Sequence, residues 1–362
     1  MNTTLRIKYV IYKLFLLTVF IILLISNYQC DSNPSSSEEN PNALPTVTPE
    51  EVGYSSEKLA QAAEFGEEIG YAALMASYDG KVFFSWGSVS ENYWSHSIRK
   101  ALLNSIFGIY VDNGTINLDD SMDDLGIDDI PPSLTDEEKQ AKIRHLLQSR
   151  SGVYHAAAAE AQIMKDTRPE RGSHPPGTFY YYNNWDFNVL GTIFEQETGT
   201  KIFEEYKRQI ADPIGMQNFD IDNCFYRYEP ELSMHPAYPF RMSARDMLRY
   251  GILYQKNGNW KGNQIIPEAW IEESTTVYSI IDSTMGVGYG YLWNVIPKGS
   301  EAAQLAGNNK IFFHTGIGVH MLMIIPEIKL VLVMRMDTDG EWMDPGEDTL
   351  DLALMILTAH TN

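Results

Sequence analysis

The spacing of apolar and polar residues predicts a helix and then a β-hairpin near the start of the folded chain. Residues 55–69 have the periodicity of an amphipathic helix. Two apolar runs, 72–78 and 81–86, flank Asp79-Gly80, a dipeptide typical of tight hairpin turns. An almost uniformly apolar stretch follows Lys100, so we expect a buried helix there.

The middle of the chain changes to helices and long polar loops. Thr135 and Glu138 have the spacing of a capping box and predict a helix that continues to Leu147. Further helices are expected from apolar periodicity and caps: 189–199, 203–210 and 243–258.

Strand-like runs return toward the C-terminus, over 288–295, 311–323 and 329–336, and a helix over 348–360 closes the chain. The last of these runs is almost wholly apolar, which favours a strand inside a sheet. Strands at both ends with helices between them predict an α/β (α+β) fold. Its α/β part spans about 48–115 and 240–362, and a mostly helical insert spans about 116–239.

The first 47 residues have the composition of an export signal and a tether. Basic residues precede an uncharged apolar run over 14–25, which is short for a membrane span and suits a signal peptide over 1–30. Residues 31–47 predict a disordered tether ahead of the folded domain, 48–362. The arrangement resembles a bacterial lipoprotein signal, in which Cys30 is lipidated, although Tyr28 and Gln29 stand where that signal prefers small residues. We therefore expect a periplasmic protein or a membrane-anchored lipoprotein, tethered through its N-terminus; plain secretion and an uncleaved anchor are the alternatives.

Charge and cysteine content exclude several classes. Acidic residues outnumber basic ones 48 to 27, for a formal charge of −21, which argues against nucleic-acid binding. If Cys30 is lipidated, Cys224 has no partner, so no disulfide framework is expected. The histidines show no metal-ligand spacing, and we expect neither a metal nor a cofactor.

A serine and a lysine three residues apart, Ser97 and Lys100, begin the apolar helix. Side chains at this spacing share one helix face, and a buried lysine that loses its proton can activate the serine as a nucleophile. The spacing alone proves little, because Ser55 and Lys58 repeat it at the predicted exposed start of a helix.

Two further short motifs lie downstream. A Tyr-x-Asn triplet fits two registers, Tyr181 with Asn183 or Tyr182 with Asn184. It can supply a phenolic base and an orienting amide, or it can be an aromatic loop packed on the core. The third motif is His314-Thr315-Gly316; its histidine is a site residue or a core residue, and its glycine allows close approach to the strand or marks a bulge.

In this order the three motifs resemble the signature of the serine β-lactamase and penicillin-binding-protein superfamily. The chain is similar to its class C-like branch, which includes esterases, D-amino-acid peptidases and 6-aminohexanoate-dimer hydrolases. The similarity runs from about Thr48 to the C-terminus and includes Pro176-Gly177-Thr178 and Ser243-Ala244-Arg245-Asp246. The resemblance implies an antiparallel sheet flanked by helices. It also selects Tyr182 and Asn184, because the family tyrosine follows the proline of Pro-Gly-Thr by six residues.

The resemblance further implies a covalent serine ester at Ser97, with Lys100 and Tyr182 sharing the removal of its proton. The backbone N–H groups of Ser97 and Ile317 would bind the oxyanion, and Asn184 would hold the acyl amide or the catalytic network. His314, Thr315 and Gly316 would line the substrate site.

His314 departs from the lysine that β-lactamases carry, a permanent cation that helps to bind the carboxylate of the substrate. Histidine is largely neutral at pH 7, so the sequence favours an exported serine hydrolase acting on a small ester or amide. A D-amino-acid or peptidoglycan peptidase, a β-lactamase and a slowly deacylating penicillin-binding sensor are the alternatives.

Overall fold

An eight-stranded antiparallel sheet forms the centre of the computed structural model, which describes residues 42–361. The predicted signal peptide and Cys30 therefore lie outside the described residues. The sheet order is β2-β1-β12-β11-β10-β9-β8-β7. Its strands, in chain order, are β1 Tyr71–Tyr78, β2 Lys81–Gly87, β7 Ser279–Asp282, β8 Val287–Tyr289, β9 Asn294–Ile296, β10 Ile311–Gly316, β11 His320–Ile325 and β12 Leu330–Met336. Two small ladders pair β3 Tyr93–Trp94 with β4 Arg241–Met242, and β5 Asn259–Trp260 with β6 Asn263–Gln264.

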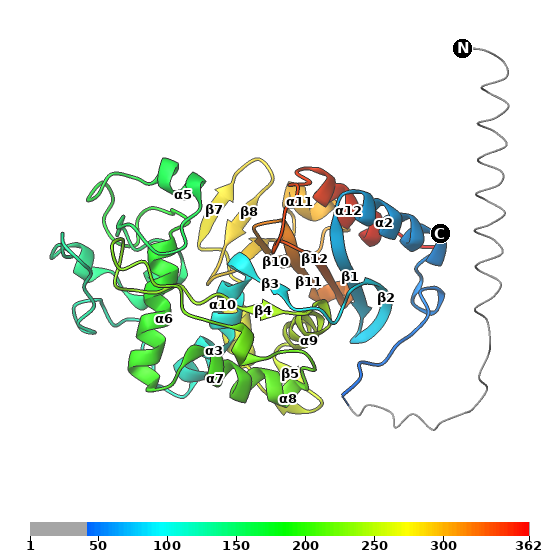
Figure 1. The fold of residues 1–362 in the computed structure, drawn as a ribbon, viewed down its shortest axis with the longest axis horizontal. Coiled ribbons are helices and arrows are strands. Elements are labelled where there is room, and N and C mark those ends of the chain that lie inside the picture. The colour runs from blue at the N-terminus through cyan, green and yellow to red at the C-terminus, as the bar shows by residue number, and fades with distance from the viewer. Residues whose placement is uncertain (1–41, 362) are drawn as a thin grey trace, which may run out of the picture. The chain divides into compact units, whose positions relative to one another are not determined.

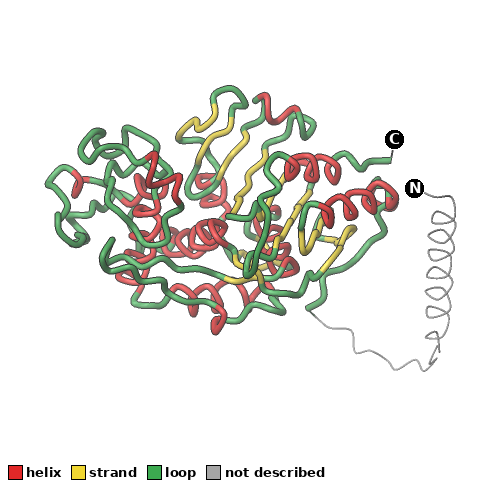
Figure 2. The backbone as a smooth tube through the Cα atoms, turned by 45° about the horizontal axis from the view of Figure 1, so that its top comes forward, coloured by secondary structure: helices red, strands yellow, loops and turns green. Residues whose placement is uncertain are grey.

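Helices cover both faces of this sheet and fill the segment between β3 and β4 (Figures 1 and 2). The α-helices are α2 Ser56–Glu68, α3 Arg99–Asp112, α4 Ile143–Leu147, α5 Gln162–Thr167, α6 Asn184–Thr198, α7 Ile202–Tyr206, α8 Asp212–Ile214, α9 Ala244–Gln255, α10 Glu268–Ser274, α11 Glu301–Gln304 and α12 Asp348–Leu357. Short 3₁₀ turns are η1 Glu50–Val52, η2 His96–Ile98, η3 Glu138–Gln140, η5 Ile221–Asn223 and η6 Pro326–Ile328, and a π-helical turn, η4, spans Lys207–Ala211.

The core has two parts because the sheet is buried on both faces. Along β1, Met75 packs into the cluster formed with α3 and α9, whereas Leu74 packs into the cluster under α2 and α12. Along β12, Val331 and Leu332 divide in the same way, and every residue of that strand is buried. Its continuous apolar sequence follows from this placement between β1 and β11.

The predicted fold class, an antiparallel sheet flanked by helices, is confirmed, and the differences are local. The capping box of Thr135 and Glu138 is present, but the helix predicted to run to Leu147 is interrupted. Residues 141–142 turn extended, because the Ala141 carbonyl accepts from Met122 N at 2.8 Å and the chain there forms a bridge to 121. The apolar runs 288–295 and 311–323 are each two strands joined by a turn.

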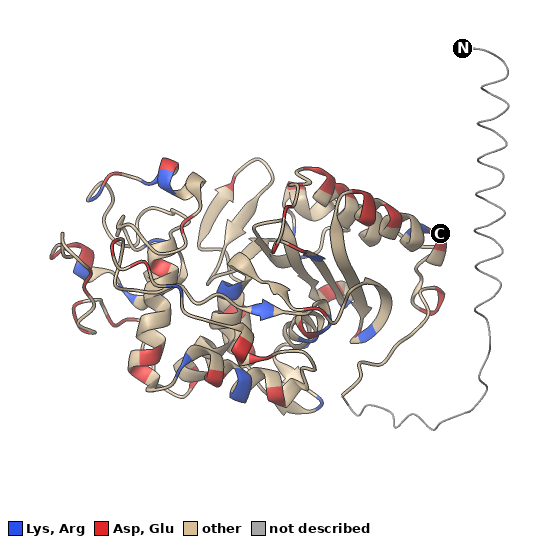
Figure 3. Ribbon diagram, viewed as in Figure 1, with Lys and Arg blue, Asp and Glu red and all other residues tan. Residues whose placement is uncertain are grey.

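Acidic residues lie mostly on the outer helices and loops, while the central strands contain few charged residues (Figure 3). Over residues 42–361 no helix is long and apolar enough to cross a membrane. Within the same range, no group of three or more His, Cys, Asp or Glu side chains is placed to hold a metal ion.

Candidate active site

A cavity of about 640 Å³ lies where the start of α3, the start of α6 and the end of β10 meet. The three sequence motifs come together here, although they are far apart in the chain. Its lining includes every predicted catalytic and substrate-binding residue: Ser97, Lys100, Tyr182, Asn184, His314, Thr315, Gly316 and Ile317.

Ser97 does not lie within the α-helix, as its spacing to Lys100 suggested, but in the 3₁₀ turn η2 directly before α3. The preceding residue, His96, has a left-handed backbone with φ +44°, a conformation that is costly for a residue with a side chain. Two contacts hold this turn in place: Ser95 N donates to Phe240 O at 2.8 Å, and His96 Nε2 lies 2.8 Å from Thr338 Oγ1. The strained turn presents the Ser97 hydroxyl at the wall of the cavity.

Lys100 has 1% of its surface exposed, and its amine connects the other two catalytic candidates. The Nζ atom donates to Ser97 Oγ at 2.9 Å and to Tyr182 Oη at 2.8 Å. It also lies 4.5 Å from the centre of the Phe187 ring. Burial, and then the positive charge of Arg99, hold the pKa of Lys100 well below its usual 10.5. The lowered pKa favours the free amine, whose lone pair can accept the serine proton.

The geometry distinguishes the two registers of the Tyr-x-Asn motif. Tyr182 meets Lys100, whereas the Tyr181 hydroxyl donates to the carbonyl oxygen of Met164. Asn183, the partner of Tyr181, is the N-cap of α6, since its side chain accepts from Trp185 N. Burial raises the pKa of Tyr182 to about 12, against the opposing effects of its hydrogen bond to Ser97 and of Arg99. Tyr182 is thus a protonated phenol at neutral pH.

Asn184 is the first residue of α6, and its side chain is fixed by backbone carbonyls. Its Nδ2 donates to Ala158 O at 3.1 Å and to Ala159 O at 2.7 Å. This leaves Oδ1 as the group with which Asn184 can contact a substrate amide.

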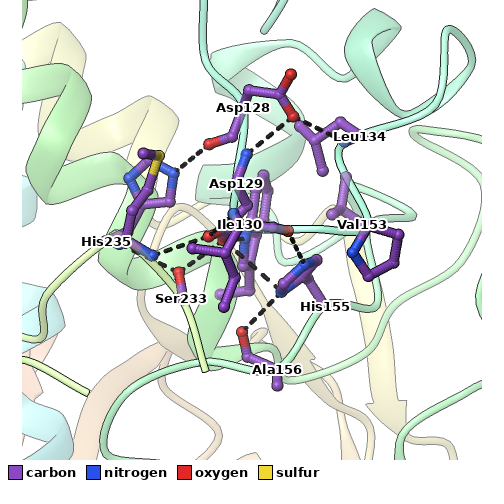
Figure 4. A network of polar contacts seen from close by, with 12 residues as sticks. Asp128, Asp129, Ile130, Leu134, Val153, His155, Ala156, Ser233 and His235 are labelled. Atoms are coloured by element: carbon purple, nitrogen blue, oxygen red, sulfur yellow. Dashed lines mark hydrogen bonds and ion pairs between the residues drawn. The ribbon is translucent and has the colours of Figure 1, made fainter. Parts of the chain in front are cut away.

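The segment that supplies those carbonyls is held by the polar network drawn in Figure 4. Buried Asp129 accepts hydrogen bonds from Trp185 Nε1 at 2.7 Å and from Ser233 Oγ at 2.6 Å. His155, in the segment itself, contacts Ile130 O at 3.3 Å and lies 3.7 Å from the Asp129 carboxylate. The Ser233 hydroxyl donates to the carboxylate and makes no hydrogen bond to the His155 ring, so the cluster supports α6 and does not form a nucleophile.

His314, in β10, is 1% exposed and lines the same cavity as Lys100. Its Nδ1 donates to Thr315 O at 2.8 Å, which leaves Nε2 as an acceptor with no hydrogen-bond partner among the described residues. Burial, followed by the charge of Lys100, lowers the pKa of His314 to about 3. His314 is therefore a neutral imidazole throughout the physiological range and supplies no cation to the site.

Gly316 brings the end of β10 against η2, the turn that contains Ser97. A Cβ atom at Gly316 would lie 2.9 Å from Ser95 O and 3.0 Å from the His96 Cβ atom, and 3.5 Å from Ser97 N. Only glycine fits this approach without a shift. The next residue, Ile317, is 51% exposed at the cavity mouth, so its backbone N–H lies in the same region as that of Ser97.

Several cavity residues have no motif to mark them in the sequence. Trp94, Tyr180 and Phe225 give the cavity aromatic walls, and Asn294 also lines it. Arg99 is marked in the sequence by its charge, which is unusual at the start of an apolar helix, and by its position inside the Ser-x-x-Lys motif. The motif analysis did not single it out.

Ser55 and Cys224, the serine of the second Ser-x-x-Lys and the cysteine without a disulfide partner, are not part of the described cavity lining. Ser55 is the N-cap of α2, and Lys58 Nζ donates to the carbonyl of His360, so the second Ser-x-x-Lys is an exposed helix start. Cys224 is half-buried, and burial raises the pKa of its thiol to about 11. That thiol is protonated and unreactive at neutral pH.

A profile described as beta-lactamase matches residues 60–355. Structures with the same fold include a D-alanine carboxypeptidase from Burkholderia cenocepacia, with 16% identity, a TM-score of 0.62 and coverage of 84% of this chain and 99% of that one. A D-stereospecific amidohydrolase from Streptomyces has 16% identity, a TM-score of 0.61 and coverage of 82% and 98%. A provisionally assigned 6-aminohexanoate-dimer hydrolase from Bacillus anthracis has 17% identity, a TM-score of 0.62 and coverage of 81% and 80%.

Among curated proteins, a D-aminopeptidase of Cereibacter sphaeroides is 34% identical over 71 residues. That match covers 18% of this chain and 14% of the relative, so the chain matches only a small part of the length of that protein.

Fold and site together define a serine hydrolase of the β-lactamase and penicillin-binding-protein type. The chain belongs to the beta-lactamase family.

Proposed function

We propose that the chain hydrolyses a small ester or amide through an acyl-enzyme at Ser97. The observation that carries this proposal is the position of the Lys100 amine, 2.9 Å from Ser97 Oγ and 2.8 Å from Tyr182 Oη at a cavity wall. In its free-base form Lys100 accepts the Ser97 proton as the hydroxyl attacks the substrate carbonyl. The protonated phenol of Tyr182 donates to the leaving group and then receives a proton from the water that cleaves the ester. Because Lys100 and Tyr182 share a hydrogen bond, their titrations belong to the pair.

The negative charge that develops on the substrate carbonyl oxygen needs donors in place beforehand. The backbone N–H groups of Ser97 and Ile317 are the proposed pair, supported by the close approach of Gly316 to the nucleophile turn. Donors of this kind typically contribute about 100- to 1,000-fold each to the rate.

The charged side chains that line the cavity indicate which substrates it suits. Its described lining contains Arg99, Lys100 and Arg227 but no Asp or Glu, in a chain with 48 acidic residues. An N-terminal ammonium group, as in an aminopeptidase substrate, would find no carboxylate there. The aromatic walls instead favour a neutral or anionic substrate with an apolar acyl or leaving group.

The test is covalent labelling by a fluorophosphonate together with a hydrolysis panel. The panel contains p-nitrophenyl esters, nitrocefin, D-amino-acid amides and a D-Ala-D-Ala peptide. We expect label on Ser97 and turnover of the esters, and loss of both in Ser97→Ala. Ser55→Ala is the matched control, since it removes the serine of the second Ser-x-x-Lys and should retain full activity. Labelling that persists in Ser97→Ala contradicts the proposal.

The same panel separates the alternatives. Cleavage of the D-Ala-D-Ala peptide or of nitrocefin in preference to esters would identify a peptidase or a β-lactamase. A stoichiometric burst with no turnover would identify a slowly deacylating penicillin-binding sensor.

We also propose that the chain is exported and anchored through a lipid on Cys30, on the basis of the basic and apolar segments that precede it. Metabolic labelling with a fatty acid tests this. We expect incorporation that is lost in Cys30→Ser, and an unlabelled protein in the membrane fraction would contradict lipidation.

A further inference from the structure

Arg99 is a buried cation with no counter-ion in the described part of the chain. Only 5% of its surface is exposed, and none of the ion pairs found within residues 42–361 includes it. Its Nη2 donates to Asn188 Oδ1 at 2.9 Å, and its Nη1 is buried without a hydrogen-bond partner in the same range. Burying an unpaired charge costs several kcal/mol, so a purely structural role is a poor explanation for an arginine here.

The guanidinium is nevertheless held in one position. It stacks on the Tyr238 ring, 4.2 Å from the ring centre, and Asn188 fixes one edge. Asn188 is itself anchored, because its Nδ2 donates to Ala158 O at 3.0 Å, the carbonyl that also accepts from Asn184. The same polar network therefore positions Arg99 and the Asn of the second motif.

The polar groups that contact Lys100, or interact with it electrostatically, come from four segments. Ser97 and His96 lie in η2, Tyr182 lies directly before α6, His314 lies in β10, and Arg99 precedes Lys100 in α3. His96 and His314 are both neutral, since burial lowers the pKa of His96 to about 4 and that of His314 to about 3. Arg99 is therefore the permanent positive charge beside the Lys100–Tyr182 pair in this part of the structure.

We propose that Arg99 is a positioning residue for the reaction, whose guanidinium is the fixed positive charge that holds Lys100 as a free amine and stabilises a phenolate on Tyr182. Arginine suits this role because it does not lose its proton, whereas a second buried lysine would. Because His314 is neutral, it does not supply a positive charge near Lys100. Arg99, the residue before Lys100 in the Ser-x-x-Lys motif, supplies that charge instead. This inference rests on the proposed function of Lys100 as the base.

The test is the pH profile of the second-order rate constant for fluorophosphonate labelling of Ser97, which needs no knowledge of the natural substrate. We expect Arg99→Gln and Arg99→Met to move the acid limb of this profile to higher pH. If the acid limb moves by one pH unit, the labelling rate constant falls about tenfold at pH values on that limb, while the alkaline plateau stays nearly unchanged. A structural defect would instead lower the rate at every pH.

Arg227→Gln is the matched control. Arg227 is also a cationic residue of the cavity lining, but Glu229 pairs with it, and it is not among the groups that act on Lys100. The acid limb of the labelling profile of Arg227→Gln should stay at its wild-type pH. If the acid limb does not move in either Arg99 variant, the inference is wrong. Labelling at Ser97 in these variants would still support the proposed function. If Arg99→Gln does not fold, Arg99→Met decides the question, since it removes the charge without burying a polar amide.

Discussion

Lys100 Nζ donates to Tyr182 Oη at 2.8 Å, across 82 positions of sequence, and the lysine is only 1% exposed. Burial acts on the two groups in opposite directions along the pH scale, because it disfavours the charged form of each. The pKa of the lysine falls and that of the tyrosine rises to about 12. Burial thus favours the neutral form of both groups, which is the form that the proposed roles of Lys100 as first base and Tyr182 as proton donor require.

Removal of the phenolic hydroxyl should slow the reaction without weakening binding. We expect Tyr182→Phe to lower kcat by about 100- to 10,000-fold, the usual contribution of a general acid or base, with little change in KM. Tyr181→Phe is the control. It loses a hydrogen bond to Met164 O, which costs about 1 kcal/mol of stability, and it should keep its activity. Ester hydrolysis and thermal unfolding of both variants provide the measurement; equal kcat values for the two would contradict the assignment.

Lys100 should lower the stability of the fold in exchange for activity. Its pKa is lower in the folded state than in the unfolded one, so the unfolded chain binds more protons and stability rises with pH up to about 10.5. We expect Lys100→Met to be inactive but more stable by about 1–2 kcal/mol at neutral pH. The gain should shrink as the pH rises toward 10.5. Urea unfolding at several pH values tests this, and a variant less stable than wild type at pH 7 would contradict it.

The close approach of β10 to the nucleophile turn should tolerate no side chain at Gly316. In Gly316→Ala the new Cβ would lie 2.9 Å from Ser95 O, so the strand must move away from Ser97 and the oxyanion donors separate. We expect kcat/KM to fall by about 100-fold or more. Gly340→Ala is the control, because a Cβ there would meet nothing within 4 Å. Comparable kinetics in the two variants would show that this approach has no part in catalysis.

The network around Asp129 should be essential for stability. Burial alone would raise the pKa of Asp129, but hydrogen bonds from Ser233, Met234 and Trp185 lower it below its usual 3.8. The stabilisation is therefore present above pH 4 and is lost as the pH falls through the lowered value. We expect Asp129→Ala to lower the free energy of unfolding by about 3–5 kcal/mol at pH 7, since it leaves several buried donors unpaired. Asp123→Ala, at an exposed position, should change it by less than about 0.5 kcal/mol.

Local sequence patterns predicted most of the secondary structure correctly. The apolar runs of β1 and β12 follow from burial of one sheet on two faces. Prediction failed where a distant segment overrode local preference. The helix expected to reach Leu147 is broken because residues 141–142 pair with residues 121–122, a contact that no pattern within 135–147 encodes.

The sequence by itself determined the order of the three motifs, the residues in them and the family to which they belong, because motif identity is a property of residue type and spacing. Only the tertiary structure distinguished Ser97 from Ser55 and Tyr182 from Tyr181 on physical grounds, by placing one of each pair within hydrogen-bond distance of Lys100 and giving the other a different partner. The neutrality of His314 and the isolation of the Arg99 charge were also decided there. Protonation depends on desolvation and on neighbouring charges, and both arise only when segments distant in sequence pack around the same cavity.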